Sequence, residues 1–323
     1  MRVRHCLPAE PEGPPRAVTI GNFDGVHRGH QAMLALLANE ARHRALRTCV
    51  LTFEPHPRDW FARQQGRPEL APPRIGTLRD KLAELEHCGA QEVVVLRFDE
   101  RLARQAPQTF VQQVLVRGLH ARYVLVGDDF RFGARREGDY AMLDRLGGEH
   151  GFDVARMMSY EVHGMRVSSS AVRQALAAGD LAAVQQLLGR PYAVSGHVVH
   201  GRKLGRELGF RTLNLRFAHP RPAAMGIFVA RVHGLGHAPL PAVASLGVRP
   251  SVEDAGRVLL EVHCLAWPDT LGIDAGYGCR LRVDLLHKLH DERRYDSLEA
   301  LRLGIAQDVR DAHAWFAQRA VPA

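Results

Sequence analysis

The stretch "AVTIGNFDGVHRGHQAMLALLANEA", residues 17–41, decides the fold of the first half of the chain. It runs from a short apolar segment through a glycine-containing turn into a run rich in alanine and leucine. This order predicts a strand, a turn and a helix. The turn holds His27 and His30. Such a pair is typical of a metal site, of a phosphate contact or of a packed turn.

The same alternation of strand and helix signals continues to about residue 158. Further apolar runs cover 48–53, 92–98, 123–127 and 152–158. Helical patterns cover 30–44, 77–88, 107–118 and 139–149. Near-continuous apolar strands that alternate with helices predict a Rossmann-like α/β domain, with a parallel sheet covered on both faces. Two short helices are predicted within 168–188, where Gly179 and Asp180 supply a C-cap and an N-cap.

The pattern changes after Gly189. Short β-type runs follow one another without helices between them, at 192–201, 226–234, 241–248, 257–267 and 279–289. This predicts an antiparallel sheet or barrel. A terminal helix follows, with an apolar stripe made of Leu298, Leu301, Ile305, Val309, Ala312 and Phe316. The fold class is therefore α/β plus all-β, with predicted domains at 1–186 and 187–323.

Composition narrows the class of protein. The 323 residues are 46% hydrophobic and 24% charged, as in ordinary globular proteins. The 5 cysteines contain no CxxC pair, which argues against a disulfide framework or zinc ribbon and favours a cytoplasmic protein. We expect no secretory signal, and no apolar run reaches the ~18 residues of a membrane span. The net charge of +8 is typical of a protein that binds nucleic acid or anionic small molecules, but arginine is spread along the chain without a basic block, which favours an arginine-rich composition as its origin.

Polar clusters follow the predicted strands of the first domain, at 21–30, 52–60, 126–139 and 166–173. In an open α/β sheet, ligands bind at the carboxyl ends of the strands. Each cluster alone is typical of an ordinary loop or of a helix cap. Together, on one rim of one sheet, they indicate a ligand site.

The residue types in these clusters suit a triphosphate. Glycines let the backbone approach a ligand, and His27 and His30 offer N–H donors. The hydroxyls of 168–170 and the amides of a helix N-terminus suit phosphate oxygens, and Arg173 adds a fork of donors. The chain has neither GxxxxGK[ST] nor GxGxxG after the first of these strands. The predicted site is therefore not a P-loop or a dinucleotide fingerprint.

The HxGH motif and the distant serine motif resemble those of the nucleotidylyltransferase superfamily. In this order, "GNFDGVHRGHQ", "TFEPHPR", "VGDDFRFG" and "RVSSSAVR" resemble the FMN adenylyltransferase module of bacterial bifunctional riboflavin kinase/FAD synthetases. The resemblance covers nearly the whole first domain. It departs from the family's SST at Ser170, which keeps the hydroxyl.

This resemblance implies that FMN and ATP react to give FAD and pyrophosphate. The FMN phosphate is already anionic, so catalysis can rest on positioning and charge stabilisation. The implied catalytic residues are His27, His30 and Arg173. The implied ATP-binding residues are Gly21, Asn22, Phe23, Asp24, His27, His30, Ser168, Ser169, Ser170 and Arg173. The implied flavin-binding residues are Arg58, Asp129 and Arg131. A capped turn remains the alternative for the Asp128-Asp129 pair.

The reaction also bears on the histidine pair. The loop offers no thiol, and Asp24 would be the nearby third ligand of a metal. The transfer needs no metal-activated water. We therefore expect both imidazoles to face ATP phosphates as hydrogen-bond donors.

The second domain contains a basic, glycine-containing stretch, "HGRKLGRELGFRTLNL", residues 200–215. Alone it is typical of a phosphate-binding loop or of a solvated turn. Together with "SLGVRPS", "LLEVHCLAW" and "HDERRYDS" it resembles the riboflavin kinase module of the same bifunctional enzymes, a six-stranded antiparallel barrel. The family's PTAN motif reads here Arg211-Thr212-Leu213-Asn214.

The resemblance also implies roles in this second domain. ATP-binding residues would be Gly201, Lys203, Gly205, Thr212 and Asn214. Thr212 and Asn214 would ligate or orient Mg²⁺, which prefers oxygen ligands. Glu261 would be the general base that takes a proton from the ribityl hydroxyl. A strand could place Glu261 inward, and the alternative is an outward-facing residue of an alternating strand. Arg293 would lie near the flavin or the phosphate.

Several functions remain open at this point. The leading hypothesis is one chain that converts riboflavin to FMN and then to FAD, with ATP as co-substrate and Mg²⁺ as cofactor. Alternatives are an adenylyltransferase with a decayed kinase domain, and an enzyme for another phosphorylated cofactor precursor, such as a pantetheine or nicotinate compound. An RNA-binding module is a different class, which would show salt-sensitive affinity. We expect no nucleic-acid or membrane partner, and self-association is left open.

Overall fold

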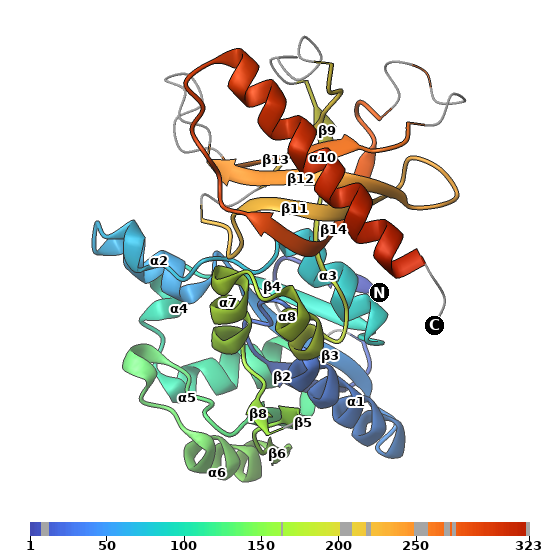
Figure 1. The fold of residues 1–323 in the computed structure, drawn as a ribbon. Helices are drawn as coiled ribbons and strands as arrows, with labels where there is room; N and C mark the ends of the chain where they lie inside the picture. Colours follow the sequence, from blue (N-terminus) through green and yellow to red (C-terminus); the bar gives the residue numbers. More distant parts are fainter. Residues whose placement is uncertain are drawn as a thin grey trace. The chain divides into compact units, whose positions relative to one another are not determined.

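The computed structural model describes residues 1–7, 13–162, 164–200, 209–217, 221–248, 258–267, 272 and 276–320. The chain forms two compact units, shown in Figure 1. The first comprises Met1–Pro72 and Lys81–Ser168, and the second comprises Pro73–Asp80 and Ser169–Ala323. The division of activities at residue 186 stays a prediction.

A six-stranded parallel sheet forms the centre of the first unit. Its strands are β1 (Arg2–Arg4), β2 (Arg16–Ile20), β3 (Arg47–Glu54), β4 (Glu92–Arg97), β5 (Ala121–Gly127) and β6 (Asp153–Met157). They lie in the order β1-β4-β3-β2-β5-β6, which confirms the predicted Rossmann-like sheet. The edge strand β1 was not predicted, because its three residues include two arginines and form no apolar run.

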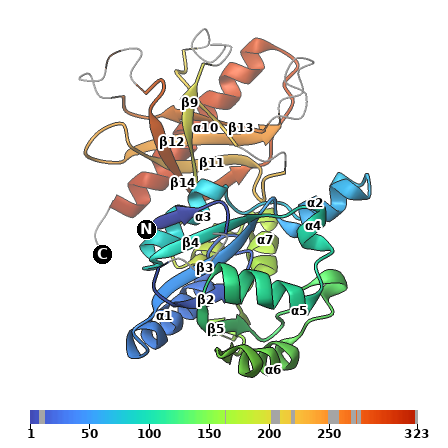
Figure 2. The same cartoon turned by 180° about the vertical axis from the view of Figure 1, so that it is seen from behind.

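Helices cover both faces of this sheet, as predicted. On one face α1 (Arg28–His43) packs Leu37 against Tyr123 and Leu125. On the other face, α5 (Pro107–Phe110), its continuation over Val111–Gly118 and α6 (Tyr140–His150) form the larger core with Val18 and Val124. Figure 2 shows α5 in front of the sheet. The unit also contains α2 (Pro57–Gln64), α4 (Glu100–Ala103), most of α3 (Leu78–His87) and the small hairpin β7 (Glu161–Val162) and β8 (Met165–Arg166).

A buried ion pair joins strands at the amino-terminal edge of the sheet. Glu92 begins β4 and has no exposed surface, and its carboxylate lies 2.8 Å from Nε of Arg16 in β2. Nε of Arg4 lies 2.9 Å from the same carboxylate. Burial alone would raise the pKa of Glu92, but the hydrogen bond and charge of Arg16, with the charge of Arg4, hold it below its usual value.

We expect Glu92→Gln to lower the free energy of unfolding by about 3–5 kcal/mol at pH 7, because it leaves a buried guanidinium without its counter-charge. The folded-state pKa of Glu92 is lowered, so its stabilisation is present above about pH 4.3 and is lost as the pH falls further. Urea unfolding at pH 7 and pH 3.5 should show the gap between wild type and variant shrinking in acid. Glu86→Gln, which removes an exposed ion pair, is the control and should change stability by less than about 1 kcal/mol.

The second unit contains a closed six-stranded barrel in which all pairs of neighbouring strands are antiparallel. Its strands are β9 (Tyr192–Val199), β10 (Leu213–Arg216), β11 (Gly226–His233), β12 (Leu240–Val248), β13 (Val258–Cys264) and β14 (Arg280–His290). They lie in the order β10-β13-β12-β11-β14-β9, which confirms the expected barrel. The short β10 has no β-type run of its own in the sequence prediction.

In the described part of this unit the barrel is accompanied by the helices α7 (Ser169–Ala178), α8 (Leu181–Leu188) and α10 (Leu298–Ala320). The predicted junction between α7 and α8 is confirmed. Gly179 adopts φ +74°, and the Asp180 side chain accepts from the amide of Ala183 at 2.9 Å. Ala312 of α10 is fully buried against Val229 and Val243, whereas Leu298 is exposed. Among the described helices, none is both long and apolar enough to cross a membrane.

Candidate active sites

The connections of the first unit place a topological switch point beside β2. The chain passes from β2 to β3 and β4 on one side, and later to β5 and β6 on the other. Ligands of open α/β sheets bind at such a switch point, outside the carboxyl ends of the strands. The loop 21–27 follows β2 there, 128–131 follows β5, and 55–60 follows β3. The fold therefore brings these polar clusters to one edge of the sheet.

His27 and His30 form a stacked pair at the start of α1. His27 is the N-cap residue, and its Nδ1 accepts a hydrogen bond from the amide of His30 at 3.3 Å. The ring centroids are 3.6 Å apart, with 16° between the planes. Because Nδ1 of His27 is an acceptor, a neutral ring carries its proton on Nε2. His27 thus carries an N–H donor beside the N-terminus of a sixteen-residue helix.

The backbone of this loop is tightly specified. Phe23, Gly25 and Val26 adopt φ angles of +49°, +84° and +40°. A positive φ is unusual for a β-branched residue and persists only where the surroundings determine it. Phe23 and Val26 are buried at 1% and 0% exposure, which anchors the turn. Gly29 has another role, because a Cβ there would lie 3.2 Å from Nδ1 of His27.

His27 is buried and His30 is half-buried. Burial, the neighbouring His27 and the charge of Lys81 hold the pKa of His30 well below its usual value. His30 is therefore neutral at neutral pH. Its Nδ1 is buried and has no hydrogen-bond partner in the described part of the chain. In the same loop Asp24 is buried, while Gly21 and Asn22 are half-buried.

Lys81 is a buried cation that the sequence prediction missed. Its Nζ donates to Oγ1 of Thr52 at 3.4 Å, and this hydroxyl donates to the carbonyl oxygen of Asn22 at 3.3 Å. The available signal was its spacing, because Lys81 and Leu85 are the buried residues of α3. A lysine four residues before a leucine on an apolar helix face marks a charge that is turned inward.

The predicted flavin-binding residues of this unit lie at the same carboxyl edge. Asp129 and Arg131 follow β5 and are exposed, and Arg131 lies 3.6 Å from Asp139. Arg58 is exposed in α2, where its amide donates to the capping Nδ1 of His56. Asp128 and Asp129 form a turn. A hydrogen bond from Ser159 and the charge of Arg166 lower the pKa of Asp128.

The serine motif falls where the chain leaves the first unit at Ser168 and enters the second at Ser169. Ser169 and Ser170 begin α7, Ser168 precedes it, and Arg173 lies within it. Nε of Arg173 donates to the carbonyl oxygen of Pro73 at 2.7 Å, which fixes the guanidinium. That these residues join His27 and His30 in one ATP site stays a prediction.

A row of polar side chains crosses the outer face of the barrel. Glu261 of β13 pairs with Asn214 of β10 on one side and with Ser245 of β12 on the other. Directly paired residues project to the same face of a sheet. Leu260 and Val262 are fully buried in the barrel, so alternation turns Glu261 outward. The inward placement is wrong, and the outward alternative is the one observed. Asn214 nevertheless keeps only 5% of its surface exposed.

The residues around this row complete a candidate site. Thr212 directly precedes β10, next to Arg211, whose guanidinium lies 3.7 Å from the centroid of the Trp267 ring. A second carboxylate, Glu292, packs against Gly247 and has its pKa raised by burial and by the charge of Glu261. The sequence prediction named its neighbour Arg293 instead, and both residues are exposed. The predicted residues Gly201, Lys203 and Gly205 fall outside the described part of the chain.

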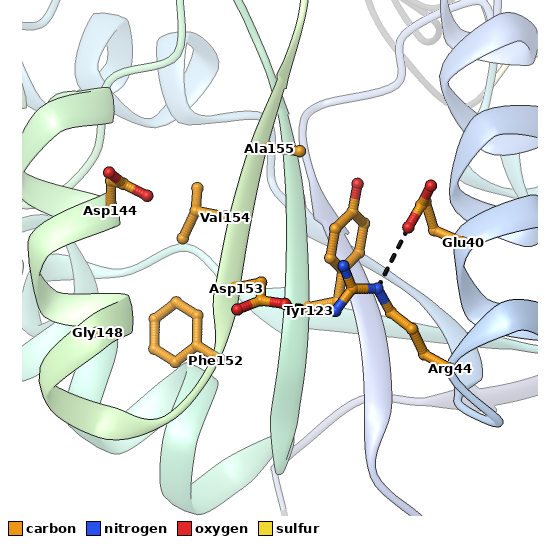
Figure 3. Close-up of a pocket in the computed structure, with 9 residues that line it drawn as sticks. All are labelled: Glu40, Arg44, Tyr123, Asp144, Gly148, Phe152, Asp153, Val154 and Ala155. Carbon is orange, nitrogen blue, oxygen red and sulfur yellow. Dashed lines mark hydrogen bonds and ion pairs between the residues drawn. The ribbon is translucent and has the colours of Figure 1, made fainter.

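A separate open pocket of about 610 Å³ lies by the amino-terminal ends of β5 and β6 (Figure 3). Arg44 lies over the ring of Tyr123 at 4.6 Å and pairs with Glu40 at 3.2 Å and with Asp153. The charges of Arg44, Glu40 and Asp153 are thus paired with one another. This pocket is at the opposite end of β5 from Asp128 and is not part of the candidate site.

Comparisons with known proteins agree with this arrangement. The family profile described as FAD synthetase matches residues 10–171, and the one described as riboflavin kinase matches residues 188–316. The first half is thus a nucleotidyltransferase and the second a kinase. A bifunctional riboflavin kinase/FMN adenylyltransferase of Escherichia coli K12 is 44% identical over 93% of this chain and 92% of its own length. One of Pseudomonas fluorescens is 42% identical over 98% of both chains.

The chain belongs to the family of bifunctional riboflavin kinases/FMN adenylyltransferases. It is an enzyme with an N-terminal FMN adenylyltransferase and a C-terminal riboflavin kinase. A crystal structure described as a macrolide-efflux protein from Streptococcus pneumoniae matches with a TM-score of 0.78, covering 98% of this chain and 100% of that one. Its sequence is 24% identical, so the likeness concerns the fold alone.

Proposed function

We propose that this chain makes FMN from riboflavin and ATP at the barrel, and FAD from FMN and ATP at the carboxyl edge of the parallel sheet. The observation that carries the FAD-forming site is the stacked histidine pair at the switch point beside β2. The row of Asn214, Glu261 and Ser245 on the barrel supports the FMN-forming site. We also propose that the enzyme acts in the cytoplasm.

In the adenylyl transfer, an oxygen of the FMN phosphate attacks the α-phosphorus of ATP, and the bond to pyrophosphate breaks. No proton has to be removed, so the protein must mainly position the phosphates and stabilise charge. Nε2–H of His27 and the N-terminus of α1 would donate to phosphate oxygens. Ser169, Ser170 and Arg173 would hold the outgoing β- and γ-phosphates.

In the kinase reaction, a ribityl hydroxyl of riboflavin attacks the γ-phosphorus of ATP, and ADP leaves. This hydroxyl must lose its proton, and the carboxylate of Glu261 would accept it. Thr212 and Asn214 fit Mg²⁺, because a hydroxyl and an amide oxygen are hard oxygen ligands. When bound with ATP, Mg²⁺ neutralises charge on the phosphates. Asn214 lies directly opposite Glu261, so nucleotide and base would meet on one face.

We expect Thr212→Ala to slow FMN formation by at least the ~10–100-fold that follows loss of an outer partner of a metal site. The Mg²⁺ concentration needed for half-maximal rate should rise, because one oxygen ligand is gone. FAD formation from added FMN, measured by chromatography on the same preparation, is the control and should not change. Unchanged FMN formation would remove Thr212 from the site, whereas absence of FMN formation by the wild type would favour a decayed kinase.

A substrate panel tests the assignment of the flavin. Purified protein is incubated with ATP, Mg²⁺ and either FMN, 4′-phosphopantetheine or nicotinate mononucleotide, and pyrophosphate release is measured. We expect release with FMN alone. Turnover of a non-flavin substrate without turnover of FMN would contradict the proposal.

A further inference from the structure

We propose that Lys81 is a positioning residue of the adenylyl transfer, a buried ammonium that holds the histidine loop in place and adds a fixed positive charge beside His30. This inference rests on the proposed function of that loop in binding the phosphates of ATP. None of the sequence motifs that resemble the family includes Lys81. Its position four residues before Leu85 indicates burial and assigns it no role.

A chain of hydrogen bonds connects Lys81 to the loop. Nζ of Lys81 donates to Oγ1 of Thr52 at 3.4 Å. The same hydroxyl donates to the carbonyl oxygen of Asn22 at 3.3 Å. Asn22 is the second residue after β2, so this contact holds the loop at its exit from the sheet. Lys81 is 4% exposed and Thr52 is fully buried, so solvent does not compete for these bonds.

The positive charge of Lys81 would also offset the negative charge of ATP at the proposed site. The histidines supply donors but no net charge, because Nδ1 of His27 is an acceptor and His30 is held neutral. A triphosphate brings several negative charges into this loop. The N-terminus of α1 offers only about half a positive charge. A fixed ammonium near His30 stabilises further negative charge, and it does so strongly because the surroundings are poor in water.

The burial of Lys81 sets the form of its contribution. At 4% exposure the ammonium does not reach the substrate, so it acts through Thr52, Asn22 and its electric field. Removing a charged group from water costs several kcal/mol, and an apolar side chain would fill the same place on α3 without that cost. A charge effect and a packing effect can therefore be separated by substitution.

The test measures FAD formation from added FMN in Lys81→Met, Lys81→Arg and Thr52→Val, with FMN formation by the same preparations as the folding control. For Lys81→Met we expect kcat/KM for ATP to fall about 10- to 100-fold, less than the loss of a direct donor. The KM for FMN should stay unchanged. Lys81→Arg, which keeps the charge, should recover most of the rate. Thr52→Val removes the hydroxyl that links Lys81 to Asn22 but keeps the charge of Lys81. Its kcat/KM for ATP should lie between those of Lys81→Met and wild type. Arg79→Met, at an exposed position of α3, should behave as wild type.

The outcomes distinguish a failure of this proposal from a failure of the proposed ATP site. If Lys81→Met forms FAD at the wild-type rate, or if Lys81→Arg is as slow as Lys81→Met, the proposal is overturned. If Lys81→Met loses both activities through unfolding, Thr52→Val decides: a loss of FAD formation alone supports the proposal, and an unchanged rate overturns it. If His30→Ala also leaves FAD formation intact, the ATP site itself is wrong.

Discussion

Replacing His27 or His30 by alanine should abolish FAD formation and leave FMN formation intact. Each change removes an imidazole donor at the switch point beside β2, and loss of one preorganised donor lowers kcat by about 10²–10³. FMN formation depends on the barrel, where the row of Asn214, Glu261 and Ser245 is untouched. Both products are measured by chromatography after incubation with riboflavin, ATP and Mg²⁺.

His27 needs a matched control, because it also caps α1. Asparagine is a good N-cap residue, so His27→Asn keeps an acceptor for the helix but loses the donor at Nε2. We expect His27→Asn to unfold at the wild-type temperature and still to make no FAD. If FAD formation returned in His27→Asn, the role of His27 would be capping. If both activities fell together in folded protein, the division of labour would be wrong.

Glu261→Gln should stop FMN formation and spare FAD formation from added FMN. Glutamine keeps the shape of the side chain but cannot accept the proton of the ribityl hydroxyl, and loss of a general base lowers the rate by about 10²–10⁴. The position is suited to this role, because Glu261 lies opposite Asn214 on the outer face of β13. The measurement is the initial rate of FMN formation at saturating riboflavin and ATP.

The matched control for this change is Glu299→Gln. Glu299 is an exposed carboxylate on α10 that pairs with Arg302 at 2.8 Å. Its loss should leave both rates unchanged. A Glu261→Gln protein that still made FMN at the wild-type rate would show that another group takes the proton. Glu292, whose carboxylate packs against Gly247, would then be the next residue to test.

The parallel sheet could be predicted because its strands are buried on both faces and read as apolar runs. Every residue of β2 is buried, for example, and β5 has one exposed residue. A search for apolar runs misses β1, because Arg2–Arg4 is a strand through its pairing with β4. It also fails for α2, which begins at Pro57 with His56 as its cap, inside a segment that reads as a polar loop.

The site could be predicted as a set of motifs, but not as a set of contacts. The place of His27 and His30 at the carboxyl end of β2 follows from the order of strand, turn and helix. Their stacking does not, because it depends on the positive φ angles of Phe23 and Val26. The contact of Lys81 with Thr52 joins elements 29 residues apart. Strand alternation predicted an outward-facing Glu261 as an alternative. Only the strand register shows that Glu261 lies opposite Asn214 on that face.

The central claim is that one chain performs two consecutive transfers at two separate sites. It is tested most directly by a time course of wild type and His30→Ala with riboflavin, ATP and Mg²⁺. Wild type should form FMN first and then FAD with release of pyrophosphate. His30→Ala should accumulate FMN at the wild-type initial rate and form no FAD. Absence of both products from wild type, or formation of FAD by His30→Ala, would contradict the claim.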